Sequence, residues 1–328
     1  MMRRKSMLFT LITLFTVLFL AGCKQNVGTP EDNAVVEESE EEKETEGHVF
    51  GFSGSDLSDP FYEVLKDSVE MSVGENDRML VRDARGDSDL QISQIRELID
   101  QGVEAVFICP VDPEAITPAL ETLSEAKIPV VNLDVRVEET ELTDAFIGAD
   151  DYNAGKVCGE DLLDRRPEGG KIVIIERPES AVINERITGF EKIIANGGFE
   201  VERIDMTDDY SVIPDELTKI FKNGPIPDAI MCGDDQMAEQ VLKALDDMSQ
   251  TDTLVYSVGG SPAVKKELAD PFSPMTGVGA KSPINMGKTA VQTATAILED
   301  GAYEQEIYVE TFFINKEDVD MYGTDGWQ

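Results

Sequence analysis

Residues 105–134 read AVFICPVDPEAITPALETLSEAKIPVVNLD. The stretch starts with an apolar run, continues with apolar residues at helical spacing, and ends with a second apolar run. Nearly continuous apolar runs that alternate with amphipathic helices are typical of a parallel sheet covered on both faces. The stretch therefore predicts a strand at 105–109, a helix at 113–126 and a strand at 129–133.

The same alternation extends to both sides of this stretch. Before it, apolar runs at 48–52 and 79–81 are each followed by apolar residues at helical spacing. After it, a second series begins at residue 171, with strands predicted at 171–175, 199–206, 228–232 and 254–258 and helices at 181–195, 211–221 and 236–246. Two consecutive series predict the α/β fold class, with two doubly wound parallel-sheet lobes that bind ligands beyond the carboxyl ends of their strands.

The first 23 residues have the composition of a secretory signal. MMRRK at residues 1–5 is basic, and the apolar run at 8–20, about 13 residues, is shorter than the ~20 that span a bilayer. The run closes with LAGC at residues 20–23, which resembles the bacterial lipobox, whose cysteine is acylated. We therefore expect residues 1–22 to be a lipoprotein signal peptide and Cys23 to carry lipid. The protein would then face outward, anchored on the outer face of the cytoplasmic membrane; a plain cleaved signal or an uncleaved anchor is the alternative.

Charge and composition argue against several functions. The net charge of −38 repels phosphate backbones, so we expect no nucleic-acid partner. Residues 23–47 contain nine acidic side chains and almost no large apolar one, which predicts a disordered linker. The single histidine, His48, lies at the edge of the folded region, which argues against histidine-dependent nucleophiles and zinc sites. We expect no catalytic residue, no cofactor and no metal, since Asp83, Asp87 and Asp89 do not follow the order of a calcium loop.

Three further cysteines are widely spaced along the chain. Cys109 and Cys232 end apolar, strand-like runs, and Cys158 lies between them in sequence. This pattern predicts buried free thiols, with a disulfide or a reactive thiol as the alternative.

Five motifs resemble, in the same order, those of the ribose-binding-like sugar-binding proteins of the type I periplasmic-binding-protein family. They are FSGSDLSDPFY (52–62), IPVVNLD (128–134), IGADDYNAG (147–155), NERITGF (184–190) and GDDQMA (233–238). In that family they correspond to the first loop, the fourth strand with its acidic binding residue, the first crossover, a helix start and a strand-to-helix turn. The resemblance covers about 48–315, nearly all of the folded region.

The resemblance implies a binding protein and not an enzyme. The N-terminal lobe would comprise 48–149 and 282–310 and the C-terminal lobe 150–281 and 311–328, with three crossovers near Ala149, Lys281 and Glu310. The lobes would close on a monosaccharide or related polar molecule, and the protein, a monomer, would deliver it to the permease subunits of an ABC importer. The same cleft would serve a sensing lipoprotein that docks on a chemoreceptor or receptor kinase, and a secreted hydrolase with paired carboxylates is a more distant alternative.

The resemblance also indicates which residues would bind the ligand. Sugar hydroxyls need carboxylates as acceptors and Arg or Lys as donors, and the faces of a sugar ring pack on aromatic side chains. The matching positions are Ser55, Asp59, Phe61, Tyr62, Asp134 and Arg136 in the first lobe, Arg186, Tyr210 and Asp234 in the second, and Lys281 at the second crossover. Several also have structural roles open to them: Asp59 could cap a helix, Phe61 and Tyr62 could be core, and Asp235 could cap a helix while Asp234 faces the cleft.

Three positions depart from the pattern of the family. Gly259 stands where the family has an aspartate, Lys281 stands where a glutamine is common, and the basic residue after Asp134 is displaced by one position to Arg136. More cations and one fewer carboxylate leave a larger, acidic or phosphorylated sugar, or another polar metabolite, open as the ligand.

Overall fold

The computed structural model describes residues 47–207 and 209–328. The predicted signal peptide, the lipidation site Cys23 and the predicted linker up to residue 46 lie outside the described residues and stay predictions. Within 47–207 and 209–328, no helix is both long enough and apolar enough to cross a membrane.

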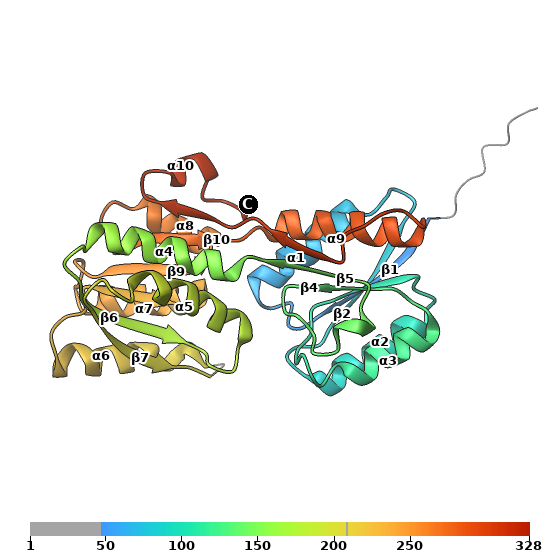
Figure 1. Ribbon diagram of the computed structural model, residues 1–328, viewed down its shortest axis with the longest axis horizontal. Coiled ribbons are helices and arrows are strands. Elements are labelled where there is room, and N and C mark those ends of the chain that lie inside the picture. The colour runs from blue at the N-terminus through green and yellow to red at the C-terminus, as the bar shows by residue number, and fades with distance from the viewer. Residues whose placement is uncertain (1–46, 208) are drawn as a thin grey trace, which may run out of the picture. The chain divides into compact units, whose positions relative to one another are not determined.

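The first sheet has six strands, and all of its pairs are parallel (Figure 1). Its spatial order is β2 (Arg78–Asp83), β1 (Val49–Gly54), β3 (Ala105–Ile108), β4 (Val130–Leu133), β5 (Ala145–Ala149) and β11 (Glu306–Val309). Its helices are α1 (Pro60–Ser72), α2 (Ser88–Asp100), α3 (Thr117–Ala126) and α9 (Pro283–Leu298). Strands β3, β4 and β5 are buried along their whole length, which explains their continuous apolar runs.

The second sheet repeats the same spatial order. Its strands are β7 (Phe199–Asp205), β6 (Gly170–Glu176), β8 (Ala229–Cys232), β9 (Leu254–Gly259), β10 (Met275–Ala280) and β12 (Phe312–Asn315). Its helices are α4 (Asp151–Arg165), α5 (Ala181–Ile194), α6 (Ile213–Asn223), α7 (Asp235–Asp247), α8 (Pro262–Ala269) and α10 (Val319–Tyr322). Only the edge strand β12 is antiparallel to its neighbour. The predicted α/β class with two mainly parallel sheets is confirmed.

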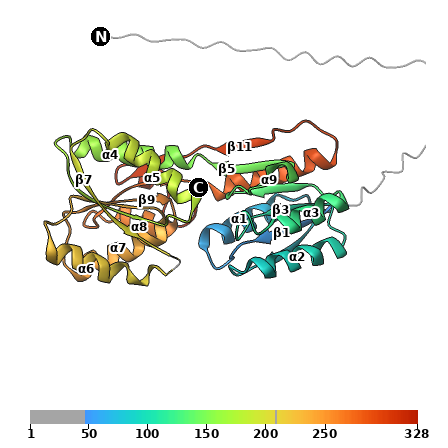
Figure 2. The same cartoon turned by 60° about the horizontal axis from the view of Figure 1, so that its bottom comes forward.

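The chain passes from one sheet to the other three times. The passages lie between β5 and α4, between β10 and α9, and between β11 and β12. Helices α1 and α9, more than 200 residues apart in sequence, lie side by side (Figures 1 and 2), and the Ser68 hydroxyl donates a 2.6 Å hydrogen bond to the Ile284 carbonyl. The lobe limits that the resemblance implies agree in order with these passages and stay a prediction.

Local chemistry explains where the helices begin, and corrects two predicted starts. The helix predicted from residue 113 begins at Thr117, because Asp112 Oδ1 accepts from the backbone N–H groups of Glu114 and Ala115 and holds a turn there. The helix predicted from residue 211 begins at Ile213, after a 3-10 turn at Tyr210–Val212. Strands β5, β10, β11 and β12 were not predicted as strands. Strands β5 and β10 are rich in glycine and alanine, so they carry little of the β-branched and aromatic signal that marks a strand. Strands β11 and β12 carry that signal but are only four residues long each.

The thiol prediction is confirmed. Cys109, Cys158 and Cys232 are free and buried. Burial raises the pKa of all three thiols, which keeps them protonated and unreactive.

Candidate functional site

A cavity of about 150 Å³ lies at the carboxyl ends of strands from both sheets. In the first sheet it is bordered by the residues that follow β1 and β4, and in the second by those that follow β6, β8 and β9. Sheets with this order bind ligands at the point where the connections diverge to opposite sides, here between β1 and β3 and between β6 and β8. Seven of the ten predicted ligand-binding residues border the cavity: Asp59, Phe61, Tyr62, Asp134, Arg186, Asp234 and Lys281.

A buried network of four charges lies beside the cavity, and three of its members, Asp134, Arg186 and Lys281, border it. Lys281 Nζ lies 2.8 Å from Asp134 Oδ1 and 3.6 Å from Asp151 Oδ1. Arg186 Nε donates to Asp151 Oδ1 at 2.7 Å, and its Nη1 donates to the Gly233 carbonyl at 2.9 Å. All four side chains are nine-tenths buried or more. The two cations and two carboxylates therefore neutralise one another inside the protein.

The electrostatics of the network favour the charged forms of Asp134 and Arg186. Burial opposes the charge of Asp134, but the charge and hydrogen bond of Lys281, aided by Arg186, outweigh burial and lower the pKa of that carboxyl. Burial likewise opposes the charge of Arg186, but Asp151 and Asp134 raise its pKa. The second oxygen of Asp134 accepts from the Tyr62 hydroxyl at 3.1 Å, and burial together with the Asp134 charge raises the Tyr62 pKa, so this phenol stays a donor.

Two further carboxylates, Asp59 and Asp234, border the cavity, and neither makes a hydrogen bond to a cation among the described residues. Asp59 caps α1 by accepting from the Phe61 N–H, and its other oxygen accepts from Gln236 Nε2 at 3.0 Å. Asp234 caps α7 by accepting from the Met237 N–H at 2.8 Å. Burial raises the pKa of both carboxyls, and the negative charge of Asp234 adds to the rise at Asp59. A hydroxyl donor between them would relieve this stress, because a hydrogen bond to the charged form favours it.

The backbone conformation at the end of β4 aims Asp134 into the site. Asp134 has a left-handed φ of 60°, a conformation that aspartate tolerates better than most residues. Its N–H donates to the Ile147 carbonyl at 2.9 Å, which ties this turn to β5. On the opposite side, Gly155 lets α4 approach α5 closely, since a Cβ there would lie 1.7 Å from the Arg186 carbonyl oxygen. That approach brings Asp151 within reach of the Arg186 guanidinium.

Three predicted ligand residues lie outside the cavity lining. Arg136 is directed to the edge of the first sheet, where it bonds to Glu306 at 2.9 Å and to the Tyr308 hydroxyl at 2.8 Å. Tyr210 reaches the site through Asp234, to which its hydroxyl donates at 2.9 Å. Ser55 is buried behind the cavity, and its hydroxyl is one of two buried side-chain polar atoms without a partner among the described residues.

The division of roles between Asp234 and Asp235 differs from the prediction. Asp234 both caps α7 and borders the cavity, whereas the suggested alternative cap, Asp235, turns inward. Asp235 accepts from the Ser257 hydroxyl at 2.7 Å and from the N–H groups of Gly260 and Ser261 at 2.8 and 2.6 Å. The last turn before α7 therefore uses the first aspartate for capping and the second to hold the β9–α8 turn.

The sequence analysis missed several residues at the site. Among them are Asp151, which pairs with Arg186, and the lining residues Arg177, Ser180, Asp235, Gln236, Glu239 and Trp327. Asp151 was within a quoted motif, and its signal was a second acidic residue directly after the first crossover. The inward orientation of Asp235 could have been inferred from Gly259, because the absence of a side chain at Gly259 leaves room for the Asp235 carboxylate. Gln236 and Trp327 also border the cavity, and no local pattern marks either of them.

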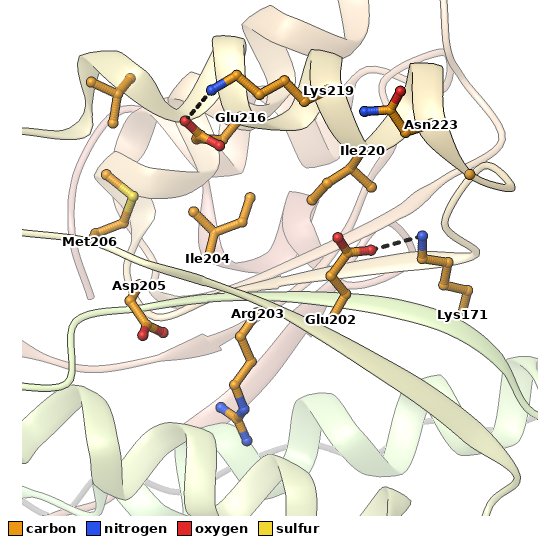
Figure 3. Close-up of a pocket in the computed structure, with 12 residues that line it drawn as sticks. Lys171, Glu202, Arg203, Ile204, Asp205, Met206, Glu216, Lys219, Ile220 and Asn223 are labelled. Atoms are coloured by element: carbon orange, nitrogen blue, oxygen red, sulfur yellow. Dashed lines mark hydrogen bonds and ion pairs between the residues drawn. The ribbon is translucent and has the colours of Figure 1, made fainter.

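A larger cavity, of about 480 Å³, lies on the outer side of the second sheet between β7 and α6 (Figure 3). Four of its charged side chains form two pairs: Lys171 Nζ lies 2.8 Å from Glu202, and Lys219 Nζ lies 2.6 Å from Glu216. Both pairs leave at least one partner well exposed to solvent. The smaller cavity, with buried charges that converge from several strand ends, has the features of a binding site, and the larger one does not.

Comparison with known proteins identifies the family of this chain. The family model "Periplasmic binding protein domain" matches residues 50–302. The ribose import binding protein RbsB of Bacillus subtilis (strain 168) is 27% identical over 259 residues, which is 78% of this chain and 84% of that protein.

Solved structures show the same fold. An ABC transporter solute binding protein from Mycobacterium smegmatis with bound glycerol has a TM-score of 0.79 at 25% identity, and the match covers 86% of this chain and 99% of that one. One from Bacillus halodurans C-125 has a TM-score of 0.77 at 21% identity, with 85% and 98% covered. The chain therefore belongs to the type I periplasmic-binding-protein family, among the ribose-binding-like sugar-binding proteins of ABC transporters.

Proposed function

We propose that this protein captures an uncharged sugar or closely related polyol in the smaller cavity, closes its two lobes on it, and delivers it to an ABC importer. The observation that carries the proposal is the mutually neutralised network of Asp134, Lys281, Arg186 and Asp151 beside the cavity. A network of this kind presents hydrogen-bonding atoms of both kinds without a net charge of its own.

The arrangement favours hydroxyl groups as the partners of these atoms. Each carboxylate oxygen can accept more than one hydrogen bond, so Asp59, Asp134 and Asp234 keep acceptor capacity beyond the contacts they already make. Arg186 Nη2 has no hydrogen-bond partner among the described residues, so it remains as a donor. Hydroxyls both donate and accept, and each bond to a charged group contributes about 1.5–3 kcal/mol.

The same arrangement disfavours an acidic or phosphorylated sugar. The cations that such a ligand would need, Lys281 and Arg186, are already paired with Asp134 and Asp151 at 2.7–2.8 Å, so two carboxylates compete with the ligand for their charge. It would also meet Asp59 and Asp234, whose charges are already under stress from burial. We therefore choose a neutral ligand over the anionic alternative that Lys281 leaves open in the sequence.

The relatives support the class of ligand and the transport role. RbsB of Bacillus subtilis is named as a ribose import binding protein, and the Mycobacterium smegmatis structure is an ABC transporter solute binding protein with bound glycerol. Anchoring through lipid on Cys23, which lies outside the described residues, completes the proposal, since a tethered binding protein stays near the permease it serves. The permease subunits and a monomeric state are part of the same proposal.

Thermal unfolding of the purified protein against a panel of sugars and polyols tests the proposal. A ligand at 100 times its dissociation constant should add about 2.7 kcal/mol to the free energy of unfolding. In Arg186→Lys, which keeps the charge but loses the guanidinium fork, a tenfold weaker affinity should reduce that gain to about 1.4 kcal/mol.

Arg203→Lys is the matched control. Arg203 borders the larger cavity and pairs with Glu176 and Glu191, so its replacement should leave the ligand-induced shift unchanged. A shift that is kept in Arg186→Lys and lost in Arg203→Lys would move the site to the larger cavity. A panel in which no sugar or polyol shifts the wild-type midpoint would refute the proposed ligand class.

A further inference from the structure

The segment that follows α10 brings the only tryptophan of the chain to the cavity. Trp327 borders the cavity together with Phe61 and Tyr62. Its ring centroid lies 5.7 Å from that of Phe61, with the two planes at 74°. Phe61 in turn lies 5.5 Å from Tyr62 at 79°. The three rings form a continuous aromatic wall, in which consecutive rings meet edge to face.

This segment is held in place by buried side chains. Lys265 Nζ donates to the Gly326 carbonyl at 2.5 Å, and the Ser282 hydroxyl donates to the Gln328 carbonyl. Gln328 Nε2 donates a hydrogen bond to the Tyr322 carbonyl at 2.7 Å. Lys265 and Ser282 are at most 1% exposed. Burial of a lysine costs free energy unless its ammonium group is hydrogen-bonded, and burial lowers the pKa of Lys265. The hydrogen bond from Lys265 to the Gly326 carbonyl offsets part of this cost and holds the segment in place.

Elements that flank both sheets hold this segment. Lys265 lies in α8 and Tyr322 in α10, both of which flank the second sheet. Ser282 caps α9, which flanks the first sheet, as does α1 with Phe61. The segment therefore joins the two sides of the cavity, with the Trp327 ring against that of Phe61.

We propose that Trp327 contacts the ligand and selects for a ring, with Lys265 as the residue that positions it. The inference rests on the proposed function and narrows it. An indole offers a broad, flat apolar surface, which matches the C–H face of a cyclic sugar or cyclic polyol, while the carboxylates and Arg186 take the hydroxyls at the ring edge. An open-chain polyol has the hydroxyls without the rigid apolar face and gains less from the indole.

Calorimetric and fluorescence titrations of the full-length protein test this assignment. The probes are pentoses, hexoses and myo-inositol as rings, and ribitol and sorbitol as open chains. Because Trp327 is the sole tryptophan, the change in indole emission on binding reports on it alone. We expect a cyclic ligand to change the emission, and Trp327→Leu to weaken the binding of that ligand about tenfold while changing open-chain binding less than threefold.

Lys265→Met separates positioning from general stability. It keeps the apolar stem and removes the donor to Gly326, and we expect cyclic ligands to bind severalfold more weakly. In the Trp327→Leu background the same substitution should have no further effect, because the residue it positions is gone. A merely structural role would lower the affinity equally in both backgrounds.

Met321→Ala serves as the control, since Met321 lies in α10 just before the segment and is 75% exposed. It should bind as the wild type does. Wild-type affinity for every ring in Trp327→Leu, or indole emission that does not respond to a bound ring, would overturn this inference and leave the proposed function standing. A wild-type protein that binds neither rings nor open chains would overturn both.

Discussion

Lys281→Gln is expected to destabilise the protein more than any surface substitution of a lysine. Lys281 Nζ lies 2.8 Å from Asp134 Oδ1, and the two side chains are 2% and 6% exposed. At that distance the gross attraction is about 6 kcal/mol for an effective dielectric constant of about 20. Much of it offsets desolvation in the intact pair, but a carboxylate that loses its partner stays buried, and such losses amount to about 3–5 kcal/mol. For a protein of this size the midpoint of thermal unfolding should fall by about 6 °C or more.

The pH dependence of the effect gives a second, independent expectation. In the wild type the pKa of Asp134 lies below its usual value, so its stabilisation is present above the pKa of the unfolded chain and is lost as the pH falls through the lowered pKa. In Lys281→Gln burial dominates and should raise the pKa of Asp134. Protonation of Asp134 at lower pH then removes the buried, unpaired charge that destabilises the variant. The difference in unfolding free energy between the two proteins should therefore shrink as the pH falls.

The assay is urea and thermal unfolding followed by circular dichroism, with a double-mutant cycle. Asp134→Asn combined with Lys281→Gln should recover most of the loss, because the pair becomes neutral. Lys219→Gln is the matched control: its bond to Glu216 is as short, 2.6 Å, but the lysine is exposed, and its midpoint should stay close to wild type. A Lys281→Gln protein that unfolds with the wild-type midpoint at neutral pH, or a double variant less stable than both single ones, would refute the reasoning.

Two further predictions follow from the same site. Gly155→Ala should destabilise the protein by about 1–3 kcal/mol and weaken ligand binding, because its Cβ would clash with the Arg186 carbonyl oxygen. Gly326→Ala is the control, since a Cβ there has open space around it and should leave the free energy of unfolding unchanged. Equal losses of unfolding free energy in the two variants, measured by chemical unfolding, would contradict this prediction. Ligand binding should release protons in mildly acidic buffer, because hydroxyls that donate to Asp59 and Asp234 lower pKa values that burial has raised. The affinity for the ligand should then fall as the pH falls through those raised pKa values. Calorimetric binding enthalpies that do not depend on the buffer's heat of ionisation would contradict the predicted proton release.

Much of the fold and part of the site could be predicted because both depend on local patterns. Strands such as β3 and β4 are buried throughout, so their apolar runs are visible in the sequence. In a parallel sheet the carboxyl ends of all strands share one edge, so residues that follow different strands, such as Asp134 and Asp234, are expected together. Both border the cavity.

The remaining features depend on pairings that no local pattern encodes. Arg136 follows Asp134 closely, and β11, which pairs with β5, brings Glu306 and Tyr308 to it from about 170 residues away. Trp327 meets Phe61 across 266 positions of sequence through a segment held by backbone carbonyls, for which side-chain identity gives no signal. The cations that the sequence offers to an anionic ligand are likewise engaged, which only the distances to Asp134 and Asp151 reveal.

Gly259 illustrates how a missing side chain can be misread. By resemblance the position lacks an aspartate, which implies the loss of an acceptor. In the structure a Cβ at Gly259 would lie 2.5 Å from Asp235 Oδ2, at a φ of +154°, so the Asp235 carboxylate already fills that space. Its oxygens are engaged by the hydroxyl of Ser257 and the N–H groups of Gly260 and Ser261. The cavity thus keeps a carboxylate beside Gly259, but this carboxylate is bound to its own turn, so in the proposed function the recognition of hydroxyls would depend on the three other carboxylates and on Arg186.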